Sequence, residues 1–201
     1  MKPNGAKLDF RPGQFIFVRF KHRTPGPEVH PFSITSAPDQ NQLTIAIKKL
    51  GDYTARLAGL PVNTLAEIEG PFGAFSYQNA QCADQIWIAG GIGITPFISM
   101  AQALPADGEY TVNLYYCVKN KNELVYGDLL KTKESAYFRV VPFFSDQQGR
   151  IGAERIIGMA AGIKRKEIFI CAPPPMIRSL TKQFIAQGVA KKLIHAEEFN
   201  F

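Results

Sequence analysis

A glycine-rich run between an apolar strand and an apolar helix constrains the fold of this 201-residue chain more than any other feature. Residues 86–88 (Ile-Trp-Ile) predict a buried strand, residues 89–96 read Ala-Gly-Gly-Ile-Gly-Ile-Thr-Pro, and residues 97–104 predict a helix. Glycines let a backbone approach an anion closely, and the free N–H groups of a first helical turn attract one. Thr95 is the expected N-cap, and Pro96 suits the first helical position. Two interpretations remain open here, a phosphate-binding turn and a Gly-rich turn that binds nothing.

The second part of the chain, residues 79–201, alternates expected strands with expected helices. The strands are expected at 85–89, 111–117, 136–143, 167–171 and 192–195. The helices are expected near 96–104, 123–133, 152–159 and 174–187. This alternation predicts an α/β domain with a doubly wound parallel sheet, which binds its ligand beyond the carboxyl ends of the strands.

The first part, residues 1–78, has short expected strands at 14–20, 43–48 and 65–69, separated by Pro and Gly turns. One short helix is expected at 54–60. This pattern predicts a small antiparallel β-barrel. The sequence thus predicts an α+β chain of two domains, with the barrel first and the parallel sheet second.

Composition narrows the range of partners. The 23 Lys and Arg against 17 Asp and Glu give a net charge of +6, which suits a polyanionic ligand such as a dinucleotide or an acidic membrane surface. No nucleic-acid-binding motif is present, so nucleic acid is not an expected partner. Cys82, Cys117 and Cys171 are far apart, which argues against a disulfide framework, an iron–sulfur cluster or a structural zinc site. No metal site and no bilayer-spanning segment are expected.

Two further motifs have chemistry of their own. Residues 30–38 place an aromatic and then several hydroxyls on one strand, which can stack a flat ring or simply form an edge strand with surface hydroxyls. Residues 47–54 (Ile-Lys-Lys-Leu-Gly-Asp-Tyr-Thr) combine a basic residue, a glycine turn and a helix start with a hydroxyl. That combination forms either a second anion cradle or an ordinary Gly-Asp turn.

Five motifs in this order resemble the ferredoxin–NADP reductase superfamily. They are His-Pro-Phe-Ser at 30–33, the 47–54 element, Gly-Pro-Phe-Gly at 70–73, the glycine run at 89–96 and Cys-Ala-Pro-Pro-Pro-Met at 171–176. The first of them most resembles the dehydrogenase domain of NADPH oxidases and ferric reductases. The resemblance implies FAD on the barrel, NAD(P)H on the parallel sheet, hydride transfer from NAD(P)H to FAD, and release of single electrons.

For FAD, the resemblance places Phe32 against the flavin ring, Ser33 at flavin N5 and His30 near the diphosphate or the ribityl chain. Lys48 and Thr54 are expected at the diphosphate, although Lys in place of the family's Arg loses a bidentate contact. The remaining residues expected at FAD or at the border between the two cofactors are Pro31, Thr35, Gly51 and Gly73.

For the nicotinamide cofactor, the resemblance assigns the pyrophosphate to Gly90, Gly91, Gly93, Thr95 and Pro96. Lys119 and Lys121 follow the second strand of the sheet, where a cation accommodates a 2′-phosphate, and they favour NADPH over NADH. The alternative for these lysines is a solvated loop.

Cys171, followed by Pro173 and Met176, is expected beside the reacting carbon of the nicotinamide. It is expected to act as a thiol that orders the cofactor and not as a thiolate, because it lies at an apolar strand end. A terminal aromatic, Phe199 or Phe201, is expected to stack on the flavin and move aside for hydride transfer. A chain cut at this point is the other interpretation.

The start of the chain also carries an expectation. Family barrels begin with a strand some ten to twenty residues before the Pro-Gly-Gln-Phe element, which here begins at Pro12. A missing first strand and a longer parent protein are therefore expected. The main hypothesis is a cytoplasmic module at the inner face of a membrane, passing electrons to a haem in a transmembrane domain and then to dioxygen or ferric iron. The alternatives are a soluble NAD(P)H-dependent flavin or ferric reductase and a non-catalytic flavin or nucleotide sensor.

Overall fold

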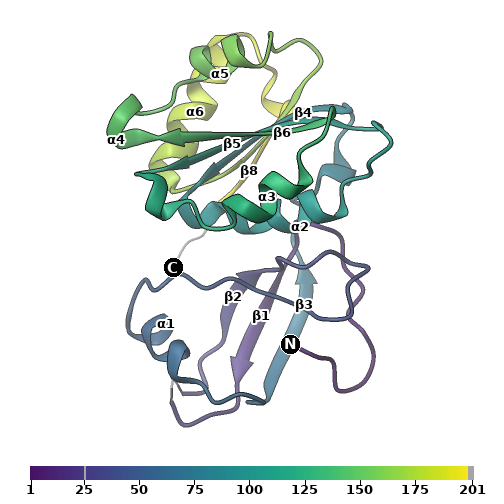
Figure 1. The fold of residues 1–201 in the computed structure, drawn as a ribbon, viewed down its shortest axis with the longest axis vertical. Coiled ribbons are helices and arrows are strands. Elements are labelled where there is room, and N and C mark those ends of the chain that lie inside the picture. The colour runs from purple at the N-terminus through teal and green to yellow at the C-terminus, as the bar shows by residue number, and fades with distance from the viewer. Residues whose placement is uncertain (25, 199–201) are drawn as a thin grey trace.

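The structure, a computed structural model, describes residues 1–24 and 26–198 and contains two sheets of different kinds (Figure 1). The first is a three-stranded antiparallel sheet of order β2-β1-β3, formed by β1 (Phe15–Phe20), β2 (His30–Ser33) and β3 (Ala66–Phe72). Ile16 and Val18 alternate along β1 and are fully buried, so one face of this sheet forms a core. The short helix α1 (Asp52–Arg56) and the 3-10 turn η1 (Leu57–Gly59) pack beside this core.

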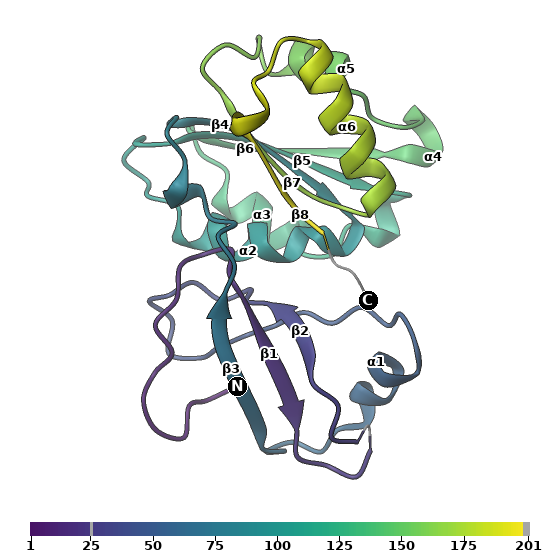
Figure 2. The same cartoon turned by 180° about the vertical axis from the view of Figure 1, so that it is seen from behind.

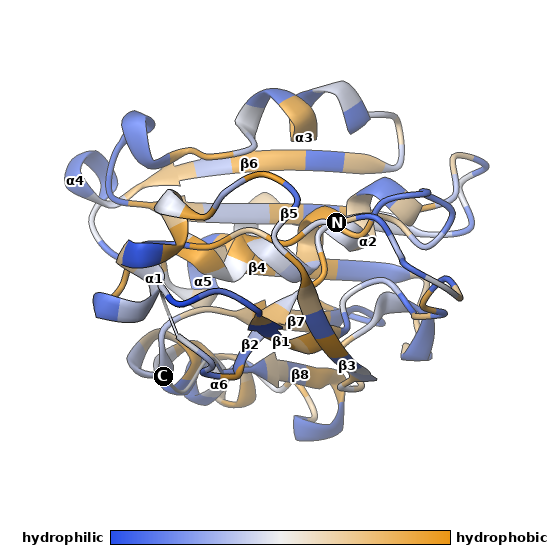
Figure 3. Ribbon diagram, turned by 90° about the horizontal axis from the view of Figure 1, so that it is seen from below, coloured by the Kyte–Doolittle hydropathy of each residue, from blue (hydrophilic) through white to orange (hydrophobic). Residues whose placement is uncertain are grey.

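The second sheet has five parallel strands in the order β6-β5-β4-β7-β8. They are β4 (Asp84–Gly90), β5 (Thr111–Val118), β6 (Phe138–Phe144), β7 (Glu167–Cys171) and β8 (Ile194–Glu197). All five residues of β7 are buried, as expected for an inner strand covered on both faces. Figure 3 shows apolar residues concentrated in the strands and polar residues in the outer loops.

Helices cover both faces of the parallel sheet. Helices α2 (Thr95–Ala103) and α3 (Gly127–Lys133) lie on the face toward the antiparallel sheet, and α5 (Ala153–Met159) and α6 (Pro174–Ala186) lie on the far face (Figure 2). Shorter turns connect them: η2 (Tyr77–Asn79), η3 (Gly91–Ile94), η4 (Lys121–Glu123), α4 (Ser145–Gln148) and η5 (Lys191–Leu193). Of the helices described here, α6 is the longest at 13 residues, and none has the length and hydropathy to cross a bilayer.

The strand order confirms the predicted doubly wound sheet. The chain runs outward from β4 to β5 and β6, then returns to β7 on the other side of β4. The connections leave the carboxyl ends of β4 and β7 in opposite directions, and such a switch point is where open α/β sheets bind ligands.

Some element boundaries differ from the sequence-based expectation. Residues 43–48 form no strand, because β2 ends at Ser33 and offers them only the isolated bridge between Ile34 and Ile45. The expected helix at 54–60 begins earlier, at Asp52, and continues as a 3-10 turn. The last strand begins at Ile194 and not at residue 192, because Lys191–Leu193 form a 3-10 turn.

Hydrogen bonds join α2 to the first half of the chain. Ser99 Oγ donates to the Ser36 carbonyl at 2.6 Å, and Gln102 Nε2 donates to the Thr35 carbonyl at 2.6 Å. Ser36 and Ser99 are buried. Because α2 follows the glycine run directly, these bonds fix the position of that run relative to the strand that carries Phe32 and Ser33.

Candidate functional site

The glycine run lies against the end of β7 at the switch point. A Cβ placed on Gly93 would lie 2.0 Å from the Cys171 carbonyl oxygen, and one on Gly90 would lie 2.7 Å from the Ala172 Cβ. The turn after β4 and the turn after β7 therefore touch, backbone against backbone. Only glycines permit this approach.

Gly91 is the glycine of the run that stays open on its outer side. Its φ of +57° favours glycine, and a Cβ there would meet no atom of the described residues within 4 Å. The 3-10 turn Gly91–Ile94 continues directly into α2, so several backbone N–H groups point out of one helix start. Such a start, with the helix dipole behind it, suits a phosphate group.

The expectation that Thr95 caps α2 is wrong. Thr95 is the first residue of the helix, with Ile94 as N-cap, and its Oγ1 donates to the Ile92 carbonyl at 3.1 Å. The reason is the 3-10 turn, which extends the helical backbone four residues upstream and moves the free N–H groups to the glycines. Pro96 lies in the first turn, as expected, and is buried.

Cys171 and Glu197 meet at the carboxyl ends of β7 and β8, where they are register partners. Burial, together with the nearby Glu197 carboxyl, raises the pKa of the Cys171 thiol well above its ordinary value. This direction agrees with the expectation of a neutral Cys171 thiol. Burial also raises the pKa of Glu197 from 4.5 to about 7. Glu197 Oε2 is buried without a hydrogen-bond partner in the described part of the chain.

The antiparallel sheet contributes Ser33 and Gly73 to the same region. Phe15 pairs with Ser33 on one side and with Phe72 on the other, and its ring would lie 3.2 Å from a Cβ on Gly73. The same Cβ would lie 3.6 Å from Glu197 Oε1. Contacts thus run from β2 across β1 and the 70–73 turn to the end of β8. Ser33 Oγ, like Glu197 Oε2, is buried without a partner among residues 1–24 and 26–198.

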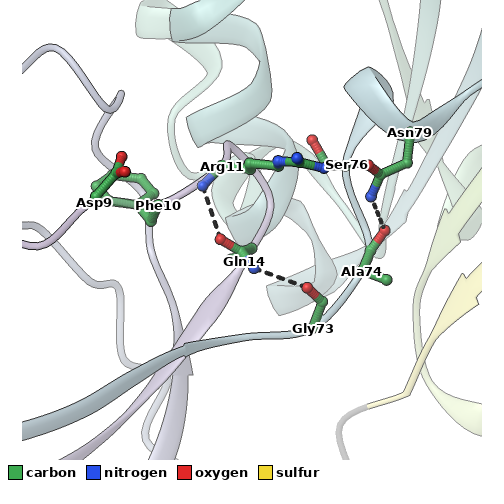
Figure 4. Close-up of a pocket in the computed structure, with 8 residues that line it drawn as sticks. All are labelled: Asp9, Phe10, Arg11, Gln14, Gly73, Ala74, Ser76 and Asn79. Atoms are coloured by element: carbon green, nitrogen blue, oxygen red, sulfur yellow. Dashed lines mark hydrogen bonds between the residues drawn. The ribbon is translucent and has the colours of Figure 1, made fainter.

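Two hydrogen bonds hold the 70–73 turn in place from its other side. Gln14 Nε2 donates to the Gly73 carbonyl at 2.9 Å, and Gln14 Oε1 accepts from the Arg11 amide at 2.8 Å (Figure 4). These residues line a pocket of about 390 Å³. Since Arg11 also donates to Asn79 Oδ1 at 2.8 Å, the turn is tied to the connection that leads into the parallel sheet.

The 47–54 segment lies beside the His-Pro-Phe-Ser element at 30–33. The rings of His30 and Tyr53 stack with centroids 3.8 Å apart, and His30 Nε2 lies 3.0 Å from Glu28 Oε2. Tyr53 belongs to α1, so this stack brings the 47–54 segment to the start of β2. Lys48 is exposed there, and so is Gly51, which is the N-cap of α1.

The Thr54 hydroxyl forms hydrogen bonds within its own loop. Its Oγ1 accepts from the Leu50 amide at 2.8 Å and donates to the Gly51 carbonyl at 3.3 Å. The hydroxyl therefore fixes the turn before α1 and does not cap the helix, as α1 begins two residues earlier.

Other residues expected to contact FAD are more buried than their motif suggests. Phe32 is 7% exposed and belongs to the core of the first sheet with Ile16 and Val18. The Thr35 hydroxyl lies 2.9 Å from the Thr44 hydroxyl and is buried, so it serves the protein interior. Pro31 is half-buried on β2.

The residues expected around the nicotinamide cofactor surround the switch point. Met176 Sδ would lie 3.1 Å, and Pro173 Cδ 2.9 Å, from a Cβ on Gly90. Lys119 follows β5 directly and is exposed, as is Lys121 in the next turn. The structure thus brings the glycine run, the 171–176 turn and the two lysines to one edge of the sheet. Phe199 and Phe201 lie outside the described residues.

Glu197 is the functional candidate that sequence reasoning missed. A Glu next to a second Glu near a chain end reads as a solvated charge, and only pairing of β8 with β7 buries it beside Cys171. The strand expected at 192–195 ends before Glu197, so the signal appears only once β8 is seen to continue to Glu197, which puts the His195 and Glu197 side chains on one face.

Family models match both halves of the chain. The model of an FAD-binding domain matches residues 1–76, and that of an oxidoreductase NAD-binding domain matches residues 87–182. A curated relative is the ferredoxin reductase component of 3-ketosteroid-9-alpha-monooxygenase from Mycolicibacterium smegmatis, 27% identical over 98% of this chain and 59% of the relative. Another is the electron transfer component of toluate 1,2-dioxygenase from Pseudomonas putida, 26% identical over 96% of this chain and 60% of the relative. The chain spans about 60% of the length of these two relatives.

Solved structures share the fold. A ferredoxin NADP+ reductase from Neisseria gonorrhoeae with bound FAD and NADP superposes with a TM-score of 0.78 at 21% identity, covering 96% of this chain and 87% of that one. The Amycolatopsis cytochrome P450 reductase GcoB gives a TM-score of 0.80 at 21% identity, covering 96% and 62%. With an FAD-binding half, a NAD(P)H-binding half and the expected order of motifs between them, the chain belongs to the ferredoxin–NADP reductase superfamily.

Proposed function

We propose that the chain is the flavin- and nucleotide-binding unit of an NAD(P)H-dependent reductase, with an FAD domain at residues 1–78 and a NAD(P)H domain at 79–201. The observation that carries this proposal is the convergence of Ser33, Gly73, Glu197 and Cys171, which come from both sheets. FAD, when bound, accepts two electrons as a hydride and releases them one at a time.

Among the described residues, three buried side-chain oxygens have no hydrogen-bond partner, and two of them, Ser33 Oγ and Glu197 Oε2, fit a ligand at this junction. The third, Ser76 Oγ, belongs to the residues that line the pocket beside Arg11. Buried hydroxyl and carboxyl oxygens are nearly always hydrogen-bonded, so unpaired ones mark a place where a partner is missing. We assign Ser33 Oγ to the flavin edge and Glu197, as a neutral carboxyl, to donation of a hydrogen bond at the same junction. Cys171 fills the space beside them as a neutral thiol.

The cradle at the switch point fits the pyrophosphate of the nicotinamide cofactor. Gly91 leaves its outer side open, and Gly90 and Gly93 bring the turn against the 171–176 segment. These residues orient the cofactor toward the antiparallel sheet, where Phe32 and Ser33 lie. Orientation of the two cofactors is most of what the protein must supply, because hydride transfer between them needs no acid–base pair.

We assign the FAD diphosphate to the 47–54 segment, with Lys48 as the cation and His30 at its border. The stack of His30 on Tyr53 holds this segment beside β2. Lys48 is exposed and free to reach a phosphate.

For the electron acceptor, the relatives favour a separate partner protein. Their names describe reductase and electron transfer components of monooxygenases and dioxygenases. A haem in a transmembrane domain, with dioxygen or ferric iron as final acceptor, is the second candidate. It is favoured by the His-Pro-Phe-Ser element at 30–33.

Anaerobic mixing of the FAD-loaded protein with NADPH or NADH tests the proposal. We expect the visible absorbance of the oxidised flavin to bleach at a rate typical of enzyme turnover, about 1–1,000 per second. If both nucleotides leave the absorbance unchanged while dithionite still bleaches it, the reductase function is excluded and a non-catalytic flavin sensor remains.

Ser33→Ala is the matching site prediction. Removing the unpaired hydroxyl is expected to lower the rate of flavin reduction by about 10-fold, the equivalent of one hydrogen bond at the reacting edge. Ser179→Ala, which alters an exposed serine on α6 whose hydroxyl bonds the Gln183 side chain, is the control. A Ser33→Ala protein with unchanged FAD content and unchanged rate would remove Ser33 from the site.

Lys119→Glu tests the preference for NADPH. Replacing a cation at the end of β5 by an anion is expected to raise the Michaelis constant for NADPH by about 10-fold or more and to change that for NADH much less. Lys133→Glu, at the C-terminal end of α3, gives the same charge change away from the site. Equal effects of Lys119→Glu on both nucleotides would contradict recognition of the 2′-phosphate at this edge.

A further inference from the structure

A buried glutamate at the end of β7 farthest from the candidate site is bound to two separate segments. Glu167 is 1% exposed and is the first residue of β7. Its Oε1 accepts the backbone N–H groups of Gln81 at 2.6 Å and Cys82 at 2.9 Å. Its Oε2 lies 2.6 Å from Nε2 of His195 on β8. One carboxyl group thus joins the connection between the two sheets to the last strand of the chain.

We infer that Glu167 is a positioning residue, which acts through His195 to hold β8 in the register that places Glu197 beside Cys171. This inference rests on the proposed function, since it takes the Cys171–Glu197 pair to lie where the cofactors meet. Glu167 itself does not touch that pair, because it lies four residues before Cys171 along β7.

The side chains involved form a ladder on one face of two strands. In β7, Glu167, Phe169 and Cys171 point to the same face, and in β8, His195 and Glu197 point to that face. Phe169 pairs with His195, and Cys171 pairs with Glu197. Whatever fixes His195 against Phe169 therefore also fixes Glu197 against Cys171.

His195 is held by two contacts on this ladder. Its ring stacks on Phe169 with centroids 4.5 Å apart and planes 23° apart, and its Nε2 meets Glu167 at 2.6 Å. A slip of β8 by two residues would break both contacts. A slip by one would turn Glu197 to the opposite face of the sheet.

β8 needs such an anchor because it is short and lies at an edge. It has four residues, and among residues 1–24 and 26–198 it pairs with β7 alone. Strand ends with few ladder bonds open readily. Burial raises the pKa of Glu197, so the ionised form of this side chain favours a more exposed position than the one that β8 gives it.

The bonds to Gln81 and Cys82 extend the role of Glu167 to the connection that enters the parallel sheet. Residues 81–82 come directly before β4, whose other end carries the glycine run. The titratable and charged groups around Glu167 are His195 and, near the start of β4, Cys82 and Asp84. The pKa of the Cys82 thiol is raised mainly by burial, and further by the Glu167 and Asp84 carboxyl groups. Lys166 pairs with Asp84 at 3.4 Å and not with Glu167.

The experiment compares Glu167→Ala with Glu167→Gln in the FAD-loaded protein. Alanine removes all three hydrogen bonds, whereas glutamine can accept both backbone N–H groups and donate to a neutral His195. We expect Glu167→Ala to slow NAD(P)H-driven flavin reduction by about 10- to 100-fold, as a small displacement of a reacting group does, and Glu167→Gln to restore most of the rate. Because displacement of β8 would expose the Glu197 carboxyl, we expect the pH midpoint of the reduction rate to fall below 7 in Glu167→Ala and in His195→Ala but not in Glu167→Gln.

Amide hydrogen exchange gives a readout that does not depend on the reaction. Glu167→Ala is expected to speed exchange in residues 194–197 and 81–82, and His195→Ala in 194–197 alone. Asp84→Asn, which breaks the neighbouring pair with Lys166, is the control and is expected to leave both segments unchanged.

The outcomes separate the inference from the proposed function. If the wild-type flavin is not reduced by either nucleotide, the proposed function fails, and exchange in 194–197 still decides whether Glu167 holds β8. Normal exchange and an unmoved pH midpoint in Glu167→Ala would overturn the inference. If Glu167→Ala does not fold, His195→Ala and Glu167→Gln decide it, and His195→Ala with wild-type exchange and midpoint would overturn it equally.

Discussion

Gly93→Ala is expected to slow nucleotide-driven reduction of the flavin by about 100-fold or more while FAD stays bound. The added Cβ would lie 2.0 Å from the Cys171 carbonyl oxygen and 2.5 Å from its carbonyl carbon. Both are backbone atoms that cannot rotate away, so the glycine turn and the end of β7 must separate. Overpacking of this kind costs about 1–3 kcal/mol in stability, and a displacement of about 1 Å at a reacting group can cost about 100-fold in rate.

FAD retention separates this effect from general unfolding. The residues assigned to FAD lie on the antiparallel sheet and α1, away from the altered turn. We therefore expect Gly93→Ala to keep its yellow colour and to be bleached by dithionite at the wild-type rate, but by NADPH or NADH about 100-fold or more slowly. The measurement is anaerobic stopped-flow absorbance with each reductant.

Gly158→Ala is the matched control for this substitution. Gly158 lies in α5, and a Cβ there would meet no atom within 4 Å. Alanine at such a helical position is expected to raise stability by about 0.5–1 kcal/mol and leave the reduction rate unchanged. If Gly93→Ala were as active as Gly158→Ala, the two turns at the switch point would not need their backbone contact.

Glu197→Gln is expected to stabilise the protein above pH 7 and to change it little near pH 4. Burial raises the pKa of Glu197 in the folded chain from 4.5 to about 7, so the folded state binds this proton more tightly than the unfolded state. Stability linked to this proton is fully present below about pH 4.5 and is lost as the pH rises through 7. A glutamine cannot ionise, so the variant keeps that stability, a gain of about 1–3 kcal/mol at pH 8.

Denaturant melts of both proteins from pH 4 to pH 8 measure the effect. The wild-type protein should lose stability relative to the variant between pH 4.5 and 7, and the difference should stay constant above 8. Glu198→Gln is the control, because Glu198 is exposed and adjacent. A difference between Glu197→Gln and wild type that is the same at every pH would contradict burial of an ionisable Glu197.

The secondary structure of the second half was predictable because its signals are local. The strand predicted at 167–171 has those bounds in the structure, and the helix predicted at 174–187 ends one residue earlier. Continuous apolar runs and the prolines after Cys171 fix such elements without help from the rest of the chain. Strands at the edge of a sheet were less predictable. Residues 43–48 alternate well in polarity, but in the structure their pairing is limited to one isolated bridge between Ile34 and Ile45.

The motifs predicted the chemistry of the site but not the burial of its side chains. The glycine run predicted an anion cradle, and the structure places it at the switch point. Thr95 and Thr54 were expected to cap helices and instead bond within their turns, because each helix begins earlier than its motif suggests. The hydroxyl of Thr35, expected at the cofactor, is turned toward Thr44.

The sequence by itself determined two halves of different periodicity, the order of five motifs, the family and the cofactors that follow from it. These are properties of short segments, and each segment carries its own apolar pattern or turn chemistry. Only the tertiary structure decided which side chains meet. Glu167, His195 and Glu197 read as unrelated residues, yet strand pairing places them on one face of β7 and β8, with Glu167 bonded to His195 and Glu197 opposite Cys171. The physical reason is that burial and pKa depend on neighbours distant in the chain, which strand order and register bring together.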